Sequence, residues 1–311
     1  MNPIITITFS PCIDKSTAVH SLVPEKKLKC SAPKLEPGGG GINVARAIKK
    51  LGGEATAIFL SGGYTGKFFN HLMEKEDIPS VIIETVNETR ENIIVVDQST
   101  NNQYRFGMPG AILKETEWQH CVKAVEEACH GGYLVASGSL PPGVPTDIYS
   151  RLAKIARHKN AKFIVDASGD ALRAAVKEGV YLLKPNLGEL SSLAGLKWID
   201  VDKAEDIARH LIDKFHCEII VVSMGADGAM LVTANNSFRV KTPAVERKST
   251  VGAGDSMLAG IVLTLANGKN IKDALAYGVA CGTAATLNPG TELCKKDDVE
   301  RLYKQITQLP E

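Results

Sequence analysis

Short β-branched segments alternate with helical segments along most of this chain. Such alternation is typical of βαβ units, in which a largely parallel sheet is covered by helices on both faces. It therefore predicts an α/β fold with a mainly parallel central sheet. The expected strands are Ile4–Phe9, Ala55–Leu60, Tyr133–Ser137, Lys162–Asp166, Tyr181–Leu183 and Glu218–Ser223.

The helices expected between these strands have an apolar side. One apolar stripe repeats at i, i+3, i+4 and i+7 and is formed by Val44, Ala47, Ile48 and Leu51. Opposite this stripe are Arg46, Lys49 and Lys50, so the pattern indicates a helix that lies on a sheet with these cations outside. Near the C-terminus, Ser256–Ala266 and Ala274–Leu287 are apolar or small on nearly all sides, and both helices should be buried.

Two segments depart from the alternation, Ser16–Leu35 and Arg90–Phe106, and we interpret them as an antiparallel flap inserted into the α/β domain. A small sheet is only marginally stable alone, so the parent domain or a second subunit has to cover its apolar face. The candidate residues of this face are Ile93, Val95, Tyr104 and Phe106. Because no linker or internal repeat interrupts the chain, we expect residues 1–311 to form one domain with this lid.

Composition limits the possible partners. The net charge is +1 and no basic tract is longer than Lys26-Lys27, so binding to nucleic acid is not expected. No apolar run could span a membrane, and the first apolar stretch is too short for a signal peptide. The seven cysteines are scattered without a Cys-x-x-Cys pair, which predicts reduced thiols in a cytoplasmic protein and no zinc site.

Asp255 is the strongest candidate for a catalytic residue. It is the only charged residue between Lys248 and Lys269. A carboxylate at the start of an apolar helix is costly to bury, so its presence indicates a functional role or a partner. An ordinary N-cap is the alternative interpretation. The preceding Gly252, Ala253 and Gly254 favour catalysis, because they leave backbone N–H groups open as an anion hole.

A base beside an anion hole suits phosphoryl transfer. Asp255 would accept the proton of the attacking hydroxyl while the amides neutralise charge on the transferred group. The helix dipole should keep Asp255 ionised and make it a weak base. A weak base is sufficient if the proton leaves late in a loose transition state.

Two other glycine-rich segments are candidates for ligand binding. Gly38–Asn43 is not a dinucleotide fingerprint, but successive glycines allow a ligand to approach the backbone; a flexible loop is the alternative. Gly62–Phe68 resembles a phosphate-binding P-loop, yet it is one residue short and has Phe68 at the magnesium-binding position. We therefore discard the P-loop interpretation.

Asn186 and Glu189 follow a strand and lie three residues apart on the helix expected there. Two oxygen ligands on one helical turn suit Mg²⁺ bound through water, because magnesium keeps most of its hydration shell. A capping box explains the same two residues equally well. Ser223–Gly228 reads as a strand end followed by an ordinary glycine turn.

Together these motifs resemble the PfkB carbohydrate kinase family, which has the ribokinase-like fold. Gly38–Asn43 resembles the N-terminal signature of the family, and Ser249–Ser256 resembles the C-terminal one. The order and spacing of the other motifs fit along essentially the whole chain. These motifs are Asp14, Arg90, Gly138–Gly143, Asn186-x-x-Glu189 and Ser223–Gly228. The implied fold is a three-layer α/β/α sandwich with a small β-sheet lid.

Within the family, the chain most resembles bacterial PfkB-type 6-phosphofructokinases, on Glu36-Pro37, Tyr104–Phe106, Met108–Gly110 and Gly138–Gly143. The resemblance implies transfer of the γ-phosphoryl group of Mg-ATP to O1 of fructose 6-phosphate, giving fructose 1,6-bisphosphate. Tagatose-6-phosphate kinase and 1-phosphofructokinase stay open as alternatives. A nucleotide-binding regulator is the alternative outside the enzymes, and a dehydrogenase is disfavoured by the missing fingerprint.

The family resemblance also implies a set of ligands. Arg90, Lys27 and Ser139 would bind the phosphate of the sugar, which suits an arginine fork with a lysine. Asp14, expected at the C-terminal end of the first strand, would hold sugar hydroxyls. The remaining sugar-site residues would be Gly38, Gly39, Gly40, Gly41 and Asn43.

For the nucleotide side, the resemblance implies ATP contacts from Lys184, Asn186, Ser223, Gly225 and Gly228. Asn186 and Glu189 would hold Mg²⁺ through water. A K⁺ ion is suggested near backbone carbonyl groups of Ser249, Val251, Ala285, Asn288 and Gly290, with Glu292 close by. The family resemblance further suggests a homodimer in which two lids pack together.

Overall fold

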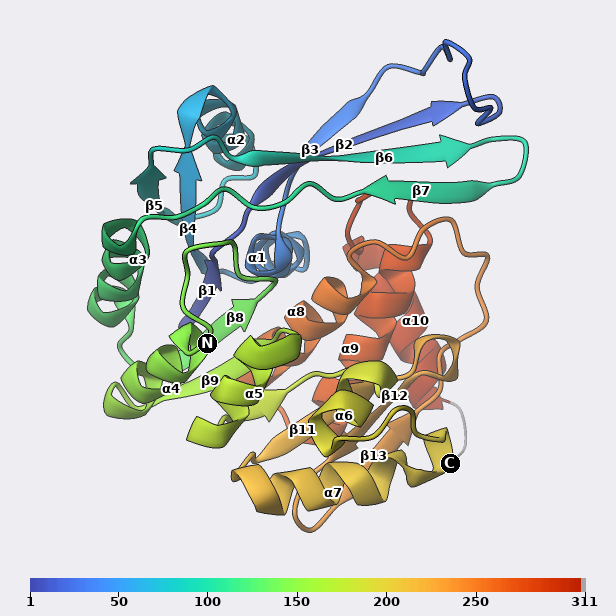
Figure 1. The fold of residues 1–311 in the computed structure, drawn as a ribbon. Coiled ribbons are helices and arrows are strands. Elements are labelled where there is room, and N and C mark those ends of the chain that lie inside the picture. The colour runs from blue at the N-terminus through green and yellow to red at the C-terminus, as the bar shows by residue number, and fades with distance from the viewer. Residues whose placement is uncertain (309–311) are drawn as a thin grey trace.

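The central element of the fold is a nine-stranded sheet in the order β13-β12-β11-β10-β9-β8-β1-β4-β5. It is seen in a computed structural model that describes residues 1–308 (Figure 1). The parallel strands are β1 (Ile4–Thr8), β4 (Thr56–Gly62), β5 (Ser80–Thr85), β8 (Gly132–Ser137), β9 (Ala161–Asp166), β10 (Leu182–Leu183) and β11 (Ile219–Ser223). Two antiparallel strands, β12 (Ala229–Val232) and β13 (Ser237–Val240), complete one edge. The predicted parallel sheet is confirmed, and β5, β12 and β13 are added to it.

Helices cover both faces of this sheet and confirm the three-layer architecture. The core of one face contains α1 (Gly40–Lys50), α2 (Gly63–Lys75), α8 (Ala253–Ala266), α9 (Ile271–Thr286) and α10 (Lys296–Gln308). The core of the other face contains α3 (Glu115–Ala128), α4 (Ile148–His158), α5 (Gly169–Glu178), α6 (Leu187–Ala194) and α7 (Ala204–Phe215). Short 3₁₀ turns occur at η1 (Val201–Lys203) and η2 (Gly225–Asp227). Within residues 1–308, none of the helices has the length and apolar character needed to cross a membrane.

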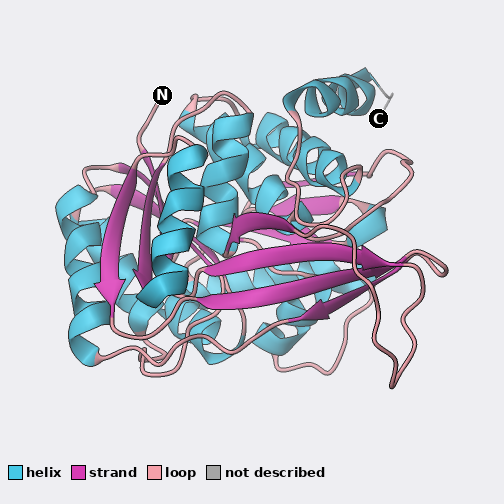
Figure 2. Ribbon diagram, turned by 90° about the horizontal axis from the view of Figure 1, so that it is seen from above, coloured by secondary structure: helices cyan, strands magenta, loops and turns pink. Residues whose placement is uncertain are grey.

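A second sheet lies along one edge of this sandwich (Figures 1 and 2). Its order is β3-β2-β6-β7, with β2 at Cys12–Val19, β3 at Lys34–Gly38, β6 at Arg90–Asp97 and β7 at Asn102–Phe106. The central pair β2 and β6 is parallel, so the prediction of a purely antiparallel flap is wrong. The sheet also begins four residues earlier than expected, at Cys12, and β3 extends to Gly38. We call these four strands the lid sheet.

The register of the lid sheet separates polar from apolar residues. Asp14 is paired with Asn92, and Gln103 and Arg105 lie on the same face. The opposite face has Ile93 paired with Phe106 and Val95 paired with Tyr104, the four residues predicted to form an apolar face. Phe106 is 46% exposed, whereas Val95 is flanked by strands on both sides and only 9% exposed. The outermost apolar residue is therefore Phe106.

Arg46 joins the lid sheet to the sandwich. Its side chain is 2% exposed, which corrects the prediction that it lies on the solvent side of α1. The guanidinium pairs with Glu36 at 3.1 Å and Glu76 at 2.6 Å, and it donates to the Pro37 carbonyl at 2.8 Å. Thr291 also donates to Glu36, at 2.7 Å. One buried cation thus connects β3 with α1 and the end of α2.

We predict that Arg46→Ala lowers the free energy of unfolding by roughly 3 kcal/mol, because Glu36 stays buried and loses its main cation. Urea denaturation followed by circular dichroism measures this change. Arg301→Ala is the matched control, since the 2.9 Å pair of Arg301 with Asp298 lies at the surface and contributes at most about 1 kcal/mol. Equal losses in the two variants would contradict the structural role of Arg46.

Candidate active site

The N-terminus of α8 has the geometry of an anion hole. Gly252 is the N-cap, and its φ of 71° is a left-handed conformation that glycine adopts without strain. Within the described chain, the amide groups of Gly254 and Asp255 have no hydrogen-bond acceptor. These groups belong to the first turn of a helix, where N–H groups point outwards and attract negative charge. An anion would be bound beside the Asp255 carboxylate.

Asp255 is half-buried in a cluster of polar groups from three other elements. Asn43 of α1 donates through Nδ2 to Asp255 Oδ2 at 2.9 Å. Asp166 lies at the end of β9 and pairs with Lys184 Nζ, which follows β10, at 3.1 Å. A Cβ on Gly254 would lie 3.4 Å from the same Nζ atom, so the ammonium sits directly beside the anion hole.

Burial, together with the nearby Asp166, raises the pKa of Asp255 to about 6. The Asn43 hydrogen bond and Lys184 act in the opposite direction. The prediction that the helix dipole makes Asp255 a weak base is therefore wrong, since loss of hydration outweighs the dipole. Such a carboxylate is a stronger base than an exposed aspartate.

Lys184 stays charged although it is only 6% exposed. Burial opposes its charge, but Asp166, Asp255 and Glu189 together raise the pKa of Lys184 above its usual value. The side chain does not line the large cavity described next, where the sequence placed it as an ATP contact. It lies instead beside the anion hole.

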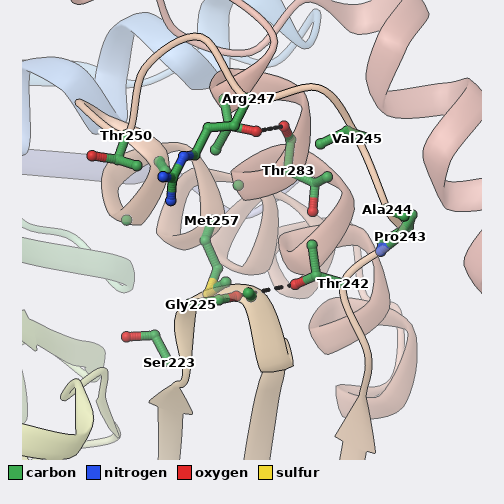
Figure 3. Close-up of a pocket in the computed structure, with 15 residues that line it drawn as sticks. Ser223, Gly225, Thr242, Pro243, Ala244, Val245, Arg247, Thr250, Met257 and Thr283 are labelled. Atoms are coloured by element: carbon green, nitrogen blue, oxygen red, sulfur yellow. Dashed lines mark hydrogen bonds between the residues drawn. The ribbon is translucent and has the colours of Figure 1, made fainter. Parts of the chain in front are cut away.

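A cavity of about 690 Å³ extends from the anion hole along α8 and α9 (Figure 3). Ala253 and Gly254 form part of its wall. Pro243, Val245 and Met257 supply apolar surface, and Ser223, Thr242 and Thr283 supply hydroxyl groups. Its size and its combination of apolar walls with few polar groups suit a nucleotide, with an apolar slot for a planar base. The helix terminus at its inner end suits the phosphates.

The structure brings only some of the predicted ATP contacts to this cavity. Ser223 and Gly225 line the cavity, but Asn186 and Gly228 do not. Gly228 is buried, and a Cβ at this position would collide with the Val240 carbonyl, so this glycine serves the β11–β12 turn. Asn186 is the N-cap of α6, outside the cavity.

Asn186 and Glu189 form the capping box that was the alternative to a metal site. Asn186 Oδ1 accepts from the Glu189 amide, and Glu189 Oε2 accepts from the Asn186 amide, both at 2.9 Å. Burial raises the pKa of Glu189, and Asp166 raises it further. Among residues 1–308, no group of three or more His, Cys, Asp or Glu side chains could hold a metal directly. The residues present fit a magnesium ion held through water, near Asp166 and Glu189.

Asp14 lies on β2 of the lid sheet and not at the end of the first strand, which corrects its predicted location. The residue is 6% exposed, and its carboxylate accepts hydrogen bonds from Asn92 Nδ2 at 2.9 Å and Cys12 Sγ at 3.3 Å. Burial raises the pKa of Asp14, while Asn92, Cys12 and Arg90 lower it. Gly38 faces this carboxylate so closely that a Cβ would collide with it.

Arg90 begins β6 with its guanidinium held by backbone carbonyl groups. It donates to Met108 at 3.0 Å and to Ser10 at 3.1 Å, while its buried Nε has no partner. Ser139 is exposed in the loop after β8, and Pro141 of this loop shares a small pocket with Arg90. Arg90 and Ser139 therefore belong to neighbouring segments.

Lys27 is not brought to Arg90 within one chain, contrary to the predicted phosphate clamp. It is exposed on the loop that follows Val19. Val19 pairs with Asp97 at one end of the β2–β6 ladder, and Arg90 lies at the other end. The whole length of the lid sheet separates the two cations.

Of the residues predicted to hold K⁺, Ser249 and Val251 lie on the loop that precedes α8. Ala285 lies in the last turn of α9, and Asn288 and Gly290 lie on the loop that follows it. Ser249 Oγ donates to the Gly290 carbonyl at 2.7 Å, and Lys248 donates to Thr286 at 2.8 Å. Glu292 instead forms salt bridges, at 2.7 Å with Lys34 of the lid sheet and at 3.4 Å with Lys295. The pKa of Glu292 is lowered by these two lysines, although burial opposes the change.

Several residues of this site carry no clear sequence signal. Asp166 ends a parallel strand at the edge where α/β proteins bind ligands, and that placement could have identified it. Asn92 and the segment 242–245 lie in ordinary strand and loop sequence. Their contribution depends on the fold that brings them to Asp14 and to the cavity.

Comparison with known proteins defines the class. The pattern of the pfkB family of carbohydrate kinases matches residues 3–298. The chain belongs to this family. It is 43% identical over 306 residues to ATP-dependent 6-phosphofructokinase isozyme 2 of Escherichia coli strain K12, covering 98% of this chain and 99% of the relative. It is 31% identical to 1-phosphofructokinase of Borreliella burgdorferi, covering 97% of each chain.

Solved structures agree with this assignment. Phosphofructokinase-2 from Escherichia coli in complex with fructose-6-phosphate superposes with a TM-score of 0.94 at 41% identity, covering 99% of this chain and 100% of that one. The same relative in complex with potassium gives a TM-score of 0.95 at 43% identity, with the same coverage. The predicted ribokinase-like fold and family membership are confirmed.

We predict that Asp255→Asn stabilises the folded protein at pH 8, by on the order of 2 kcal/mol, and that the gain shrinks towards pH 4. The folded pKa of about 6 exceeds the ordinary value of 3.8. Folding therefore disfavours the ionised carboxylate, and this penalty appears as the pH rises through that interval.

Urea denaturation at pH 4.5 and pH 8 measures the two free energies of unfolding. The exposed Asp213→Asn is the control and should leave the pH dependence of the wild type unchanged. A gain for Asp255→Asn that is the same at both pH values would contradict the raised pKa.

Proposed function

We propose that this protein is an ATP-dependent 6-phosphofructokinase that converts fructose 6-phosphate to fructose 1,6-bisphosphate. The observation that carries the proposal is the location of Asp255 between two sites. The nucleotide-sized cavity ends at Ala253 and Gly254. The lid residue Asp14 is close enough to raise the pKa of Asp255, and Arg90 in turn lowers the pKa of Asp14. The 43% identity to the Escherichia coli 6-phosphofructokinase supports this substrate.

In the proposed reaction Asp255 removes the proton from the O1 hydroxyl as O1 attacks the γ-phosphorus. With a pKa of about 6, the carboxylate is ionised near neutral pH and is still a useful proton acceptor. Asn43 fixes its orientation through the 2.9 Å hydrogen bond. The free amide groups of Gly254 and Asp255, with the Lys184 ammonium, stabilise negative charge on the phosphoryl group.

The sugar phosphate would lie between the lid sheet and the tetraglycine segment Gly38–Gly41. Asp14 would accept hydrogen bonds from ring hydroxyls, and the spare donors of Arg90 would bind the 6-phosphate together with Ser139. The fixed, carbonyl-supported guanidinium supports this role, because a preorganised fork binds phosphate well.

Two cations are part of the proposal. Glu189 and Asp166 would hold Mg²⁺ through water next to Asn186, and the bound metal would supply positive charge to the β- and γ-phosphates. Backbone carbonyl groups would hold K⁺ from Ser249 and Val251, before α8, and from Ala285, Asn288 and Gly290, at and after the end of α9. The potassium complex of the Escherichia coli relative supports the second site.

A second candidate is 1-phosphofructokinase, favoured by the 31% identity to the Borreliella burgdorferi enzyme. Tagatose-6-phosphate kinase is chemically as close, because only the configuration at C4 differs. The location of Arg90 relative to Asp255 favours neither by itself. The position of the phosphate and the configuration at C4 of the accepted substrate decide among them.

We predict ADP release with fructose 6-phosphate at a kcat/KM at least about 10-fold above that with fructose 1-phosphate, tagatose 6-phosphate or fructose. Asp255→Asn should lower kcat about 100-fold or more, because the base acts in the transition state. Asp213→Asn is the exposed control. Preference for fructose 1-phosphate would replace the proposed substrate, and retention of a tenth of kcat in Asp255→Asn would refute the base.

We further propose a cytoplasmic homodimer in which the apolar faces of two lid sheets pack together. All seven cysteines are unpaired thiols, which supports a reducing compartment. Tyr104 and Phe106 are 38% and 46% exposed, which supports a partner for this face. A two-fold contact is the commonest way to cover such a surface.

We predict that Phe106→Asp gives monomers and raises the KM for the sugar phosphate, since the opposite face of the same sheet carries Asp14 and Arg90. Phe106 is the position to change because it is 46% exposed, whereas Val95 on the same face is buried. Light scattering measures the assembly, and Trp198→Asp, which changes a 69% exposed aromatic away from the lid sheet, is the control. A fully active wild-type monomer at assay concentration would refute the proposal.

A further inference from the structure

The glycine-rich segment Gly62–Phe68, which resembles a P-loop in sequence, begins α2, and a carboxylate of the protein itself binds its amide groups. Glu88, from the connection between β5 and β6, accepts hydrogen bonds from the Tyr64 amide at 3.1 Å, the Thr65 amide at 2.9 Å and Thr65 Oγ1 at 2.6 Å. Gly63 has a φ of 69°, and a Cβ there would collide with this carboxylate. The N-terminus of α2 thus binds Glu88 where a P-loop would bind phosphate.

Glu88 is ionised in this location. The Thr65 hydroxyl, the Thr65 amide and the Tyr64 amide lower the pKa of Glu88 below its usual value. A carboxylate is also favoured at a helix N-terminus by the helix dipole. The contact between Glu88 and α2 is therefore a set of charge-assisted hydrogen bonds.

The connection between β5 and β6 is attached to the sandwich on both sides of Glu88. The Thr89 amide donates to the Gly62 carbonyl at 3.0 Å, and Thr89 Oγ1 accepts from the Gly62 amide at 3.1 Å. The Val86 amide donates to Glu117 of α3 at 2.8 Å. The next residue after this connection is Arg90, so the start of β6 is placed by contacts with α2 and α3.

Arg90 has no ionic partner that could fix its side chain. Among residues 1–308 it forms no salt bridge, its buried Nε makes no hydrogen bond, and its other nitrogen atoms donate only to neutral oxygen atoms. Its orientation therefore depends on the placement of its backbone. On one side of the strand Arg90 is paired with Cys12 of β2, and along the chain it follows Glu88 and Thr89. All three residues from Glu88 to Arg90 border one small pocket.

We propose that Glu88 is a positioning residue for the sugar phosphate: by binding the N-terminus of α2, it fixes the connection that presents Arg90 to the ligand. The inference rests on the proposed function, in which Arg90 binds the phosphate already on the sugar. Glu88 does not contact the substrate and takes no part in phosphoryl transfer. Without its carboxylate the connection loses three hydrogen bonds. An arginine fork with a mobile backbone then binds the phosphate oxygens less well.

Steady-state kinetics of Glu88→Ala test the proposal. We expect the KM for the sugar phosphate to rise about 10-fold, on the scale of a lost helix cap, while kcat and the KM for ATP change less than about 3-fold. Glu84→Ala is the matched control and should change none of these constants. Glu84 borders the same pocket at the start of α2 as Glu88, but its exposed side chain makes no hydrogen bond among residues 1–308. A wild-type KM in Glu88→Ala, or a loss confined to kcat, would overturn the proposal.

A double-mutant cycle with Arg90→Ala separates positioning from a general loss of stability. If Glu88 acts through Arg90, Glu88→Ala should raise the KM for the sugar phosphate by less than about 2-fold when residue 90 is already alanine. A rise as large as in the wild-type background would mean that Glu88 acts independently of Arg90, and the proposal would be wrong.

Thr65→Val replaces Glu88→Ala if the latter fails to fold. It removes only the 2.6 Å hydrogen bond and should raise the KM for the sugar phosphate by a smaller factor, whereas an unchanged KM would contradict the proposal. The two levels of the argument fail differently. If neither Arg90→Ala nor Glu88→Ala raises this KM, the proposed sugar site is wrong, and the role of Glu88 with it. If only Arg90→Ala raises it, the sugar site stands and the role of Glu88 alone is refuted.

Discussion

The hydrogen bond between Asn43 and Asp255 is the contact on which this site depends. It joins the first turns of α1 and α8, two helices whose N-termini point at the same space. The lid sheet enters α1 through β3 and Gly38, and the cavity ends at the first turn of α8. Asn43 therefore connects the half of the molecule that holds Asp14 with the half that would hold a nucleotide.

Two opposing effects determine the character of Asp255. A helix N-terminus stabilises a carboxylate, whereas burial beside Asp166 destabilises it. Burial dominates, and the carboxyl group becomes a proton acceptor near neutral pH. Lys184 keeps the surrounding charge in balance, because without it Asp166 would be an uncompensated carboxylate below the anion hole. The same arrangement that makes Asp255 reactive makes the ionised site less stable than a neutral one.

The sequence predicted the features that depend on local pattern. The strands of the parallel sheet, the amphipathic α1 and the buried α8 and α9 follow from spacing and residue type. The glycines before Asp255 likewise indicated the helix N-terminus with open amide groups that the structure has there. Contacts between distant segments could not be predicted in this way. The sequence pattern places Arg46 at the surface, but in the fold Glu36 and Glu76 pair with it and it is buried. Asp14 lies outside the central sheet because the chain turns into the lid sheet at Ser10-Pro11. Lys27 has the positive charge that a phosphate site needs, but it follows the end of the β2–β6 ladder that is opposite to Arg90. The sequence alone does not define this pairing of strands.

The parallel pairing of β2 with β6 has a consequence for how the protein folds. Asp14 and Asn92 are hydrogen-bonded neighbours separated by 78 residues of chain. No local hairpin can form this pair, because parallel strands need a long crossover connection, and the chain between β2 and β6 includes β4, α2 and β5. Long-range pairings of this kind raise contact order and form slowly. On the ribosome, β2 can pair only with β3 until β6 has left the exit tunnel, so Asp14 meets Asn92 only after β4, α2 and β5 have been synthesised.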